Sequence, residues 1–142
     1  PEIPPVCIAC IDKKVPGEGM ETGMAVLGYR ETGFHKKMVI VVDTDVDPTD
    51  LDRVMHAIAT RWQPDPASLI VKQSFHFLVD PSTQRNFLSS KIVIDATRQL
   101  PAEGGPKQFA RDNRTAMAQG APGAFALVDA KWESYFAGAR SA

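Results

Sequence analysis

A strand, an acidic turn and a helix follow one another in residues 37–61, and this order constrains the fold more than any other feature. Residues 38–42 (MVIVV) form an unbroken apolar run rich in β-branched side chains, which is typical of a strand buried on both faces. The apolar residues after the turn recur at helical spacing at Leu51, Val54, Met55 and Ile58. A buried strand that leads into an amphipathic helix predicts one step of an α/β fold.

The rest of the chain continues this alternation of strands and helices. Further strands are predicted at 6–11, 68–72 and 91–95, and further helices at 20–30, 107–118 and 130–139. We therefore predict a three-layer α/β/α fold with a mainly parallel or mixed sheet. Three parts are expected: an amino-terminal strand–helix segment over 1–36, an α/β core over 37–106 and a carboxy-terminal helical arm over 107–142.

The helical arm is expected to pack either on this domain or on a neighbouring chain. Its last predicted helix carries Trp132, Tyr135 and Phe136 on one side, which is more apolar than a solvated tail.

The composition is that of a soluble globular domain, with 44% hydrophobic and 23% charged residues. The net charge of −1 gives no global attraction to nucleic acid or to an anionic membrane. No apolar run approaches the ~20 residues that span a bilayer. The first five residues, PEIPP, lack the basic and apolar regions of a secretion signal, so a cytoplasmic location is expected.

The acidic turn contains Asp43, Asp45 and Asp47, which superficially resemble the opening of a calcium loop. Such a loop needs Gly at its sixth position and Glu at its twelfth, and this chain has neither residue there. Capping of the following helix by Asp47 or Thr49 is the favoured interpretation. A ligand-binding role stays open, because open α/β sheets bind ligands at the carboxyl ends of their strands.

Cys7 and Cys10 form a C-x-x-C pair within a predicted strand. Residues three apart in a strand point to opposite faces, and no other cysteine is present to complete a zinc site. We therefore predict two buried thiols rather than a redox pair or a metal site. Of the histidines, His56 is expected to be partly buried in a helix, and His35 is expected to lie in a solvated basic turn.

Four segments occur in order along the chain: KKVPG at 13–17, MVIVVDTDVDPTDLDRVMHAIATRWQPD at 38–65, VDPS at 79–82 and SSKIVIDATRQLP at 90–101. In this order and spacing they resemble the carboxy-terminal domain of UbiD-type decarboxylases, and the resemblance extends over residues 6–106. These enzymes use prenylated FMN to remove or add carboxylate on aromatic and unsaturated acids. The last segment departs from the family pattern at Val93, where the family has glycine.

The resemblance implies a carboxy-lyase: the carboxy-terminal domain or small subunit of a UbiD-like (de)carboxylase. Its substrate would be an aromatic or α,β-unsaturated carboxylic acid or a phenolic compound. Because the family's catalytic and cofactor-binding residues lie upstream, no catalytic or metal-binding residue is expected in this chain. Prenylated FMN, a divalent metal ion and, as an additional candidate, K⁺ are expected on a partner chain or a missing region. An oligomer is expected, without nucleic acid or membrane, and packing of the helical arm between subunits is slightly favoured over packing on the same chain. The alternative is a non-catalytic assembly or binding subunit that keeps the fold.

The resemblance also implies two groups of site residues. The first group lies in the loop that shapes the family's substrate pocket: Phe75, His76, Phe77 and Leu78. Without the resemblance, the same residues would be read as a loop that covers the core. The second group lies beside the first P-G and is expected to bind the cofactor: Lys13 and Lys14.

Overall fold

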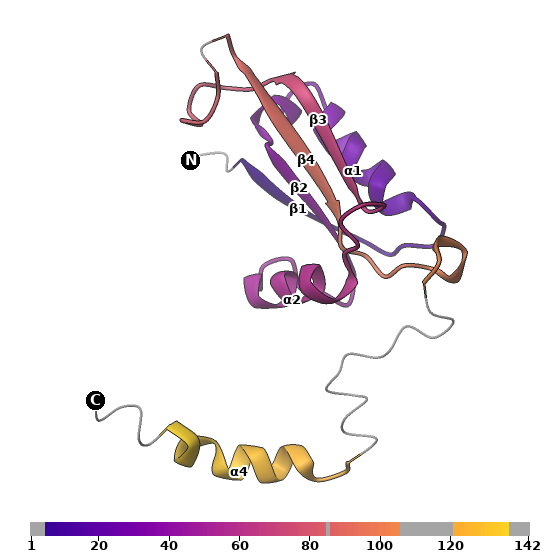
Figure 1. Cartoon of the computed structure of the whole chain (residues 1–142), viewed down its shortest axis with the longest axis vertical. Coiled ribbons are helices and arrows are strands. Elements are labelled where there is room, and N and C mark those ends of the chain that lie inside the picture. The colour runs from indigo at the N-terminus through magenta and orange to yellow at the C-terminus, as the bar shows by residue number, and fades with distance from the viewer. Residues whose placement is uncertain (1–4, 85, 106–120, 137–142) are drawn as a thin grey trace. The chain divides into compact units, whose positions relative to one another are not determined.

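The computed structural model describes residues 5–84, 86–105 and 121–136 (Figure 1). The chain divides into two compact units, residues 1–107 and residues 108–142. The described part of the first unit contains, in order, β1 (Val6–Ile11), α1 (Glu18–Gly28), the 3₁₀ turn η1 (Gly33–His35), β2 (Met38–Asp43), α2 (Leu51–Arg61), β3 (Ser68–Phe75), β4 (Leu88–Asp95) and the 3₁₀ turn η2 (Pro101–Glu103).

The four strands form one mixed sheet in the order β1-β2-β4-β3. β1, β2 and β4 run parallel to one another, and β3 is antiparallel to β4 at one edge. This confirms the predicted α/β class with a mixed sheet. The full three-layer arrangement and the three-part division of the chain stay predictions.

β2 is buried on both faces, because its side chains alternate between two apolar clusters. On one face Ile40 and Val42 pack with Val54 of α2. On the other face Val39 and Val41 pack in the cluster that α1 covers. All four of these β2 side chains are buried, as expected for a strand covered on both sides.

α1 lies close to β4 because two of its glycines face the strand. A Cβ at Gly19 would stand 2.3 Å from Asp95 Oδ1, and a Cβ at Gly23 would stand 2.2 Å from Val93 Cγ1. The two glycines are four positions apart and therefore share one face of the helix. Val93, which departs from the family pattern, fills the space that Gly23 leaves open.

α2 is capped by Asp50, not by Asp47 or Thr49. The Asp50 side chain accepts a hydrogen bond from Arg53 N at 3.2 Å. Asp47 Oδ1 instead accepts from the amide and the hydroxyl of Thr49 within the turn, at 2.9 and 2.7 Å. The predicted cap is wrong. Asp47, Thr49 and Asp50 are all residue types that favour the cap position, and the backbone path of the turn decides which of them occupies it.

Cys10, predicted as buried, and His56, predicted as partly buried, both lie at the surface. Cys10 is exposed and Cys7 is half-buried, because β1 is an edge strand of the sheet. The thiols do lie on opposite faces: Cys7 packs against the cluster that α1 covers, and Cys10 Sγ lies 4.0 Å from Val46 O. His56 is exposed on α2, since the buried positions of that helix are Val54 and Ala57.

Among the residues that the structure describes in the first unit, none covers one half of the sheet face that α2 shares. A row of four apolar residues crosses the strands at this place: Val6, Met38, Ile92 and Ile70. The row lines an apolar hollow of about 240 Å³, together with Pro5, Lys37, Ser90 and Lys91. α2 packs instead over the neighbouring half, where Ile40 and Ile94 lie.

The described part of the second unit is α4 (Ala124–Phe136). This helix begins at Ala124 rather than at the predicted Ala130. Residues 137–139 and the whole helix predicted over 107–118 lie outside the described residues. None of the helices described here has the length and apolar character needed to cross a membrane.

Candidate functional site: an aromatic surface

Aromatic rings gather at the edge of the sheet where β2 and β4 begin. Phe34 and His35 lie just before β2, Phe87 lies just before β4, and Phe75 ends β3. Because β3 runs antiparallel to β4, its carboxyl end meets the amino ends of β2 and β4 at this edge. Phe77 follows β3 in the β3–β4 loop, and this loop lies at the end of the sheet away from α2 (Figure 1). These five residues form what we call the aromatic surface.

The five rings contact one another in a continuous series. Phe34 joins the two segments, because its ring centroid lies 5.9 Å from that of Phe75 and 6.0 Å from that of Phe77. His35 lies 3.9 Å from Phe34 and 5.4 Å from Phe77, and Phe75 stacks on Phe87 at 6.0 Å. Phe75, Phe77 and Phe87 are 53%, 43% and 41% exposed. The series therefore presents an apolar surface to solvent.

The β3–β4 hairpin, which carries three of these rings, has an irregular backbone. Gln73 and Phe87 have φ of 50° and 63°, and no other non-glycine residue in the described ranges has a positive φ. The register of β3 against β4 shifts between Val71 and Ser74, so Gln73 lies in an irregularity of the bulge type. A left-handed conformation costs roughly 1–2 kcal/mol at a residue with a side chain. Strain of this kind concentrates at functional sites.

Asp80 ties the β3–β4 loop to the start of β2. Its carboxylate accepts hydrogen bonds from Lys37 Nζ at 2.7 Å and from the amide and hydroxyl of Ser82 at 2.9 and 2.7 Å. The bond from Lys37, followed by those from Ser82, holds the pKa of Asp80 far below its usual range. The loop is therefore held by a charged contact at neutral pH.

His76 lies beneath the aromatic surface and is 1% exposed. Its Nδ1 lies 2.7 Å from the carbonyl oxygen of Phe34, which can only accept, so Nδ1 carries the hydrogen. Its Nε2 lies 3.4 Å from Asp80 Oδ2 and has no hydrogen-bond partner within the described part of the chain. His76 thus contacts both segments of the surface from below, whereas Phe77 and Leu78 face solvent. The substrate-pocket role of this loop stays a prediction.

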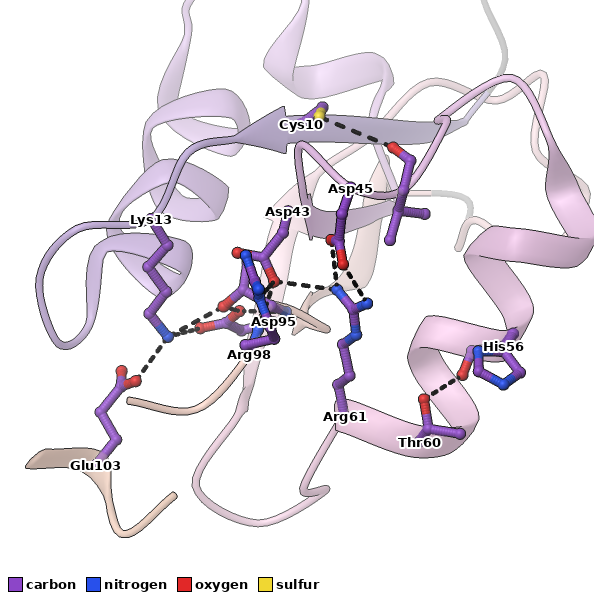
Figure 2. A network of polar contacts seen from close by, with 12 residues as sticks. Cys10, Lys13, Asp43, Asp45, His56, Thr60, Arg61, Asp95, Arg98 and Glu103 are labelled. Atoms are coloured by element: carbon purple, nitrogen blue, oxygen red, sulfur yellow. Dashed lines mark hydrogen bonds and ion pairs between the residues drawn. The ribbon is translucent and has the colours of Figure 1, made fainter. Parts of the chain in front are cut away.

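A polar network occupies the opposite edge of the sheet, where the parallel strands end (Figure 2). Lys13 follows β1, and its ammonium lies 3.0 Å from Thr97 Oγ1, 2.8 Å from Glu103 and 3.7 Å from Asp95. Burial raises the pKa of Glu103, but the bonds from Lys13 and from two backbone amides outweigh it and lower that pKa. The Lys13 side chain is 2% exposed, whereas Lys14 faces solvent. The cofactor role of the two lysines stays a prediction.

Asp43 and Asp45 of the acidic turn bind arginine side chains. Arg61, the last residue of α2, lies 3.1 Å from Asp43 Oδ2 and 2.9 and 2.8 Å from the two carboxylate oxygens of Asp45 (Figure 2). Arg98, after β4, donates its amide to Asp43 at 2.7 Å. The Arg61 hydrogen bond lowers the pKa of Asp45. Across residues 5–84, 86–105 and 121–136, no group of three His, Cys, Asp or Glu residues could hold a metal ion. The aspartates therefore join α2 to the strand ends.

The aromatic surface suits a flat apolar ligand better than the carboxyl edge does. Open α/β sheets usually bind ligands at the carboxyl edge, but here Lys13 and Arg61 are paired within the domain. The sequence pattern did not single out Phe34, and it placed His35 in a solvated turn. His35 is instead half-buried against Phe34 and Phe77. One feature of the sequence could have pointed to Phe34 and His35 as site residues: both stand just before a predicted strand.

The fold and the site together define a mixed-sheet α/β domain with an aromatic edge and an internally paired polar edge. The family model of the 3-octaprenyl-4-hydroxybenzoate carboxy-lyase C-terminal domain matches residues 3–96. The chain belongs to this family, the UbiD family. The resemblance drawn from the four sequence segments is therefore confirmed.

Individual relatives agree with this assignment. The chain is 38% identical over 98 residues to the anhydromevalonate phosphate decarboxylase of Archaeoglobus fulgidus, over 69% of this chain and 22% of that protein. The open form of the vanillic acid decarboxylase of Sedimentibacter hydroxybenzoicus matches with a TM-score of 0.70 at 30% identity, over 75% of this chain and 23% of that chain. The UbiD-class enzyme HmfF of Pelotomaculum thermopropionicum, in complex with FMN, matches with a TM-score of 0.64 at 31% identity, over 86% and 25%. This chain thus spans a quarter of the length of these proteins or less.

Proposed function

We propose that this chain serves as the carboxy-terminal domain or small subunit of a UbiD-like (de)carboxylase of aromatic or α,β-unsaturated carboxylic acids. The family and the decarboxylase names of its relatives support this function. Because the relatives are about four times longer than the matched region, the catalytic residues are assigned to a partner chain or a further region. The complete assembly is proposed to be an oligomer.

The aromatic surface is the observation that carries this proposal. Phe75, Phe77 and Leu78 are exposed on a loop that His76 and Asp80 hold in place. Exposed rings on an anchored loop can stack on the ring or double bond of an unsaturated acid. We therefore assign one wall of the substrate cleft to this loop, with His76 supporting it from beneath.

Prenylated FMN is the proposed cofactor, with a divalent metal ion and, as an additional candidate, K⁺, all held outside this chain. A flavin phosphate needs a cation with available donors. The Lys13 ammonium is surrounded by Glu103, Asp95 and Thr97, so Lys13 does not fit a phosphate site. Lys14 faces solvent and fits only the rim of one. When bound, the flavin supplies the electron sink, and this chain contributes binding surface and orientation.

Flavin retention tests whether the site is divided between chains. We expect the purified 142-residue chain to show no flavin absorbance. A complex with the companion UbiD-like polypeptide should retain the flavin and release CO₂ from 4-hydroxybenzoic or cinnamic acid. Stoichiometric flavin on the chain alone would contradict the proposal.

Substitutions in the loop test the substrate wall in the same complex. Phe77→Ala combined with Leu78→Ala should raise KM by roughly tenfold, since lost ring contacts are worth about 1.4 kcal/mol. The control is His56→Ala on the exposed face of α2, which should leave KM unchanged.

The second candidate function is that of a non-catalytic assembly or binding subunit. The internal pairing of Lys13 and of Asp43 favours it, because these side chains at the usual ligand edge are engaged within the domain. This candidate predicts unchanged turnover when Phe77 and Leu78 are replaced. The same kinetic comparison therefore separates the two functions.

A further inference from the structure

The turn η1 (Gly33–His35) is held from below by two buried side chains. Lys91 Nζ donates to the carbonyl oxygen of Gly33 at 2.8 Å, and His76 Nδ1 donates to that of Phe34 at 2.7 Å. Lys91 is 4% exposed and His76 is 1% exposed. Donors from β4 and from the β3–β4 loop thus hold consecutive carbonyls of one short turn.

This arrangement carries an energetic cost. Burial of the Lys91 ammonium removes its hydration and lowers its pKa. An aliphatic residue at this position of β4 would avoid that cost. Gly33 admits no side chain either, because a Cβ there would stand 2.1 Å from Leu27 O. Both observations indicate that the position of η1 is tightly specified.

The ring that this arrangement fixes is that of Phe34. It bridges Phe75 and Phe77, with centroid distances of 5.9 and 6.0 Å. Phe34 is half-buried, whereas Phe75 and Phe77 are exposed, so Phe34 lies deeper than its two neighbours. A ligand that stacks on Phe75 or Phe77 and extends inward meets Phe34.

We propose that Phe34 is a specificity-determining residue of the substrate cleft and that His76 and Lys91 are the positioning residues that hold it. The inference rests on the proposed function and adds the α1–β2 connection as a second segment of the wall. A phenyl ring at position 34 limits the size of the apolar group that fits beside Phe75 and Phe77. The wild-type assembly therefore favours a single-ring acid over a fused two-ring acid.

Substrate discrimination in the flavin-loaded complex tests the role of Phe34. The probes are 4-hydroxybenzoic acid and 6-hydroxy-2-naphthoic acid, compared by kcat/KM. Phe34→Ala should shift the ratio toward the naphthoic acid by roughly tenfold or more, because removal of a ring opens more space than the single methylene for which tenfold discrimination is typical. The exposed-face variant His56→Ala should leave the ratio unchanged.

Paired substitutions test the positioning residues. His76→Asn keeps an N–H close to the place of Nδ1, and His76→Leu removes it. Lys91→Arg and Lys91→Met form the corresponding pair. We expect His76→Leu and Lys91→Met to raise KM for the single-ring acid by a larger factor than they lower kcat. In His76→Asn and Lys91→Arg, KM should stay close to the wild-type value.

Amide hydrogen exchange in the 142-residue chain gives a readout that does not depend on activity. Exchange at residues 34–36 should be roughly tenfold faster in His76→Leu, a loss of about 1.4 kcal/mol of local stability, and close to wild type in His76→Asn. If His76→Leu does not fold, the asparagine variant and Phe34→Ala still decide the question.

The results of these experiments distinguish a failure of the inference about Phe34 from a failure of the proposed function. A wild-type complex without decarboxylase activity overturns the proposed function and this inference with it. An active complex in which Phe34→Ala leaves the substrate ratio unchanged overturns only the inference. Faster exchange across the whole sheet, rather than at residues 34–36, would assign His76 to general stability and remove its positioning role.

Discussion

Gly23 shows how one absent side chain sets the distance between a helix and a sheet. Glycine is a poor helix former, and its presence in α1 weakens any helix prediction made from propensity alone. The structure supplies the reason: Val93 of β4 occupies the space where a Cβ would stand. A local disadvantage in the helix is thus explained by a contact with a residue 70 positions further along the chain.

Gly23→Ala should lower the free energy of unfolding by about 1–2 kcal/mol. The clash with Val93 costs about 1–3 kcal/mol and outweighs the gain of about 1 kcal/mol in helix propensity. Urea unfolding of the full chain measures the change. Gly28→Ala is the matched control, since a Cβ added there would have nothing within 4 Å, and it should stabilise the chain by up to about 1 kcal/mol. Equal losses in the two variants would contradict the close contact.

Asp80 of the β3–β4 loop is expected to make the stability of the fold sensitive to acid. Its pKa is lower in the folded chain than in the unfolded chain, so its ionised form stabilises the fold above about pH 4. That contribution is lost as the pH falls toward the folded-state pKa. Asp80→Asn should therefore cost about 1 kcal/mol at pH 7 and progressively less below about pH 4. A difference between wild type and variant that persists unchanged at low pH would refute this role.

At the scale of the elements, Arg61 connects the end of α2 to the end of β2. It binds Asp43, which is 2% exposed, and both oxygens of Asp45. The end of a helix carries a partial negative charge that favours a cation there. The acidic turn therefore stabilises both ends of α2: Asp50 caps the start, and Asp43 and Asp45 hold the last residue.

Arg61→Met should destabilise the chain by about 3 kcal/mol, because it leaves Asp43 buried with fewer charged partners. Arg53→Met removes an exposed ion pair with Asp50 and keeps the capping amide, so it should cost less than about 1 kcal/mol. Thermal and urea unfolding compare the two variants. Similar losses would show that the buried pair contributes no more than a surface pair.

The helices and strands could be predicted from the sequence where the apolar residues follow a single clear pattern. β1 and β2 follow from short apolar, β-branched runs, and α2 follows from its helical spacing. The end of β3 was not readable, because the irregularity at Gln73 carries the strand past Lys72 to Phe75. The aromatic surface was only half readable, since Phe34 joins the loop residues through the antiparallel placement of β3. That placement depends on tertiary contacts, which no local pattern encodes.

At the scale of the whole molecule, the described part of the first unit covers the sheet face under α2 unequally. The hollow along Val6, Met38, Ile92 and Ile70 lies beside the half that α2 protects. Ile70 is 59% exposed, whereas Ile94 on the protected half is 7% exposed. The two isoleucines therefore probe the open and the covered half of one face.

Ile70→Lys should change the free energy of unfolding by less than about 0.5 kcal/mol, as is usual at exposed sites. Ile94→Lys should cost more than about 4 kcal/mol, because it places a charge in the closed cluster. Chemical unfolding of the full chain gives both values. A large loss at Ile70 would mean that the hollow is closed in solution.

The separation of the Lys13 and Arg61 ion pairs from the aromatic rings has an evolutionary consequence. The bonds of Lys13 and Arg61, which fasten the chain at the strand ends, lie at the far edge from Phe34 and Phe77. Replacement of an aromatic ring at one edge leaves those bonds intact. Under the proposed function, a change of substrate preference therefore need not lower the free energy of unfolding below what the fold requires. Under the same proposed function, a lineage that carries this domain can acquire new substrates through single aromatic exchanges, each tolerated before the next arises.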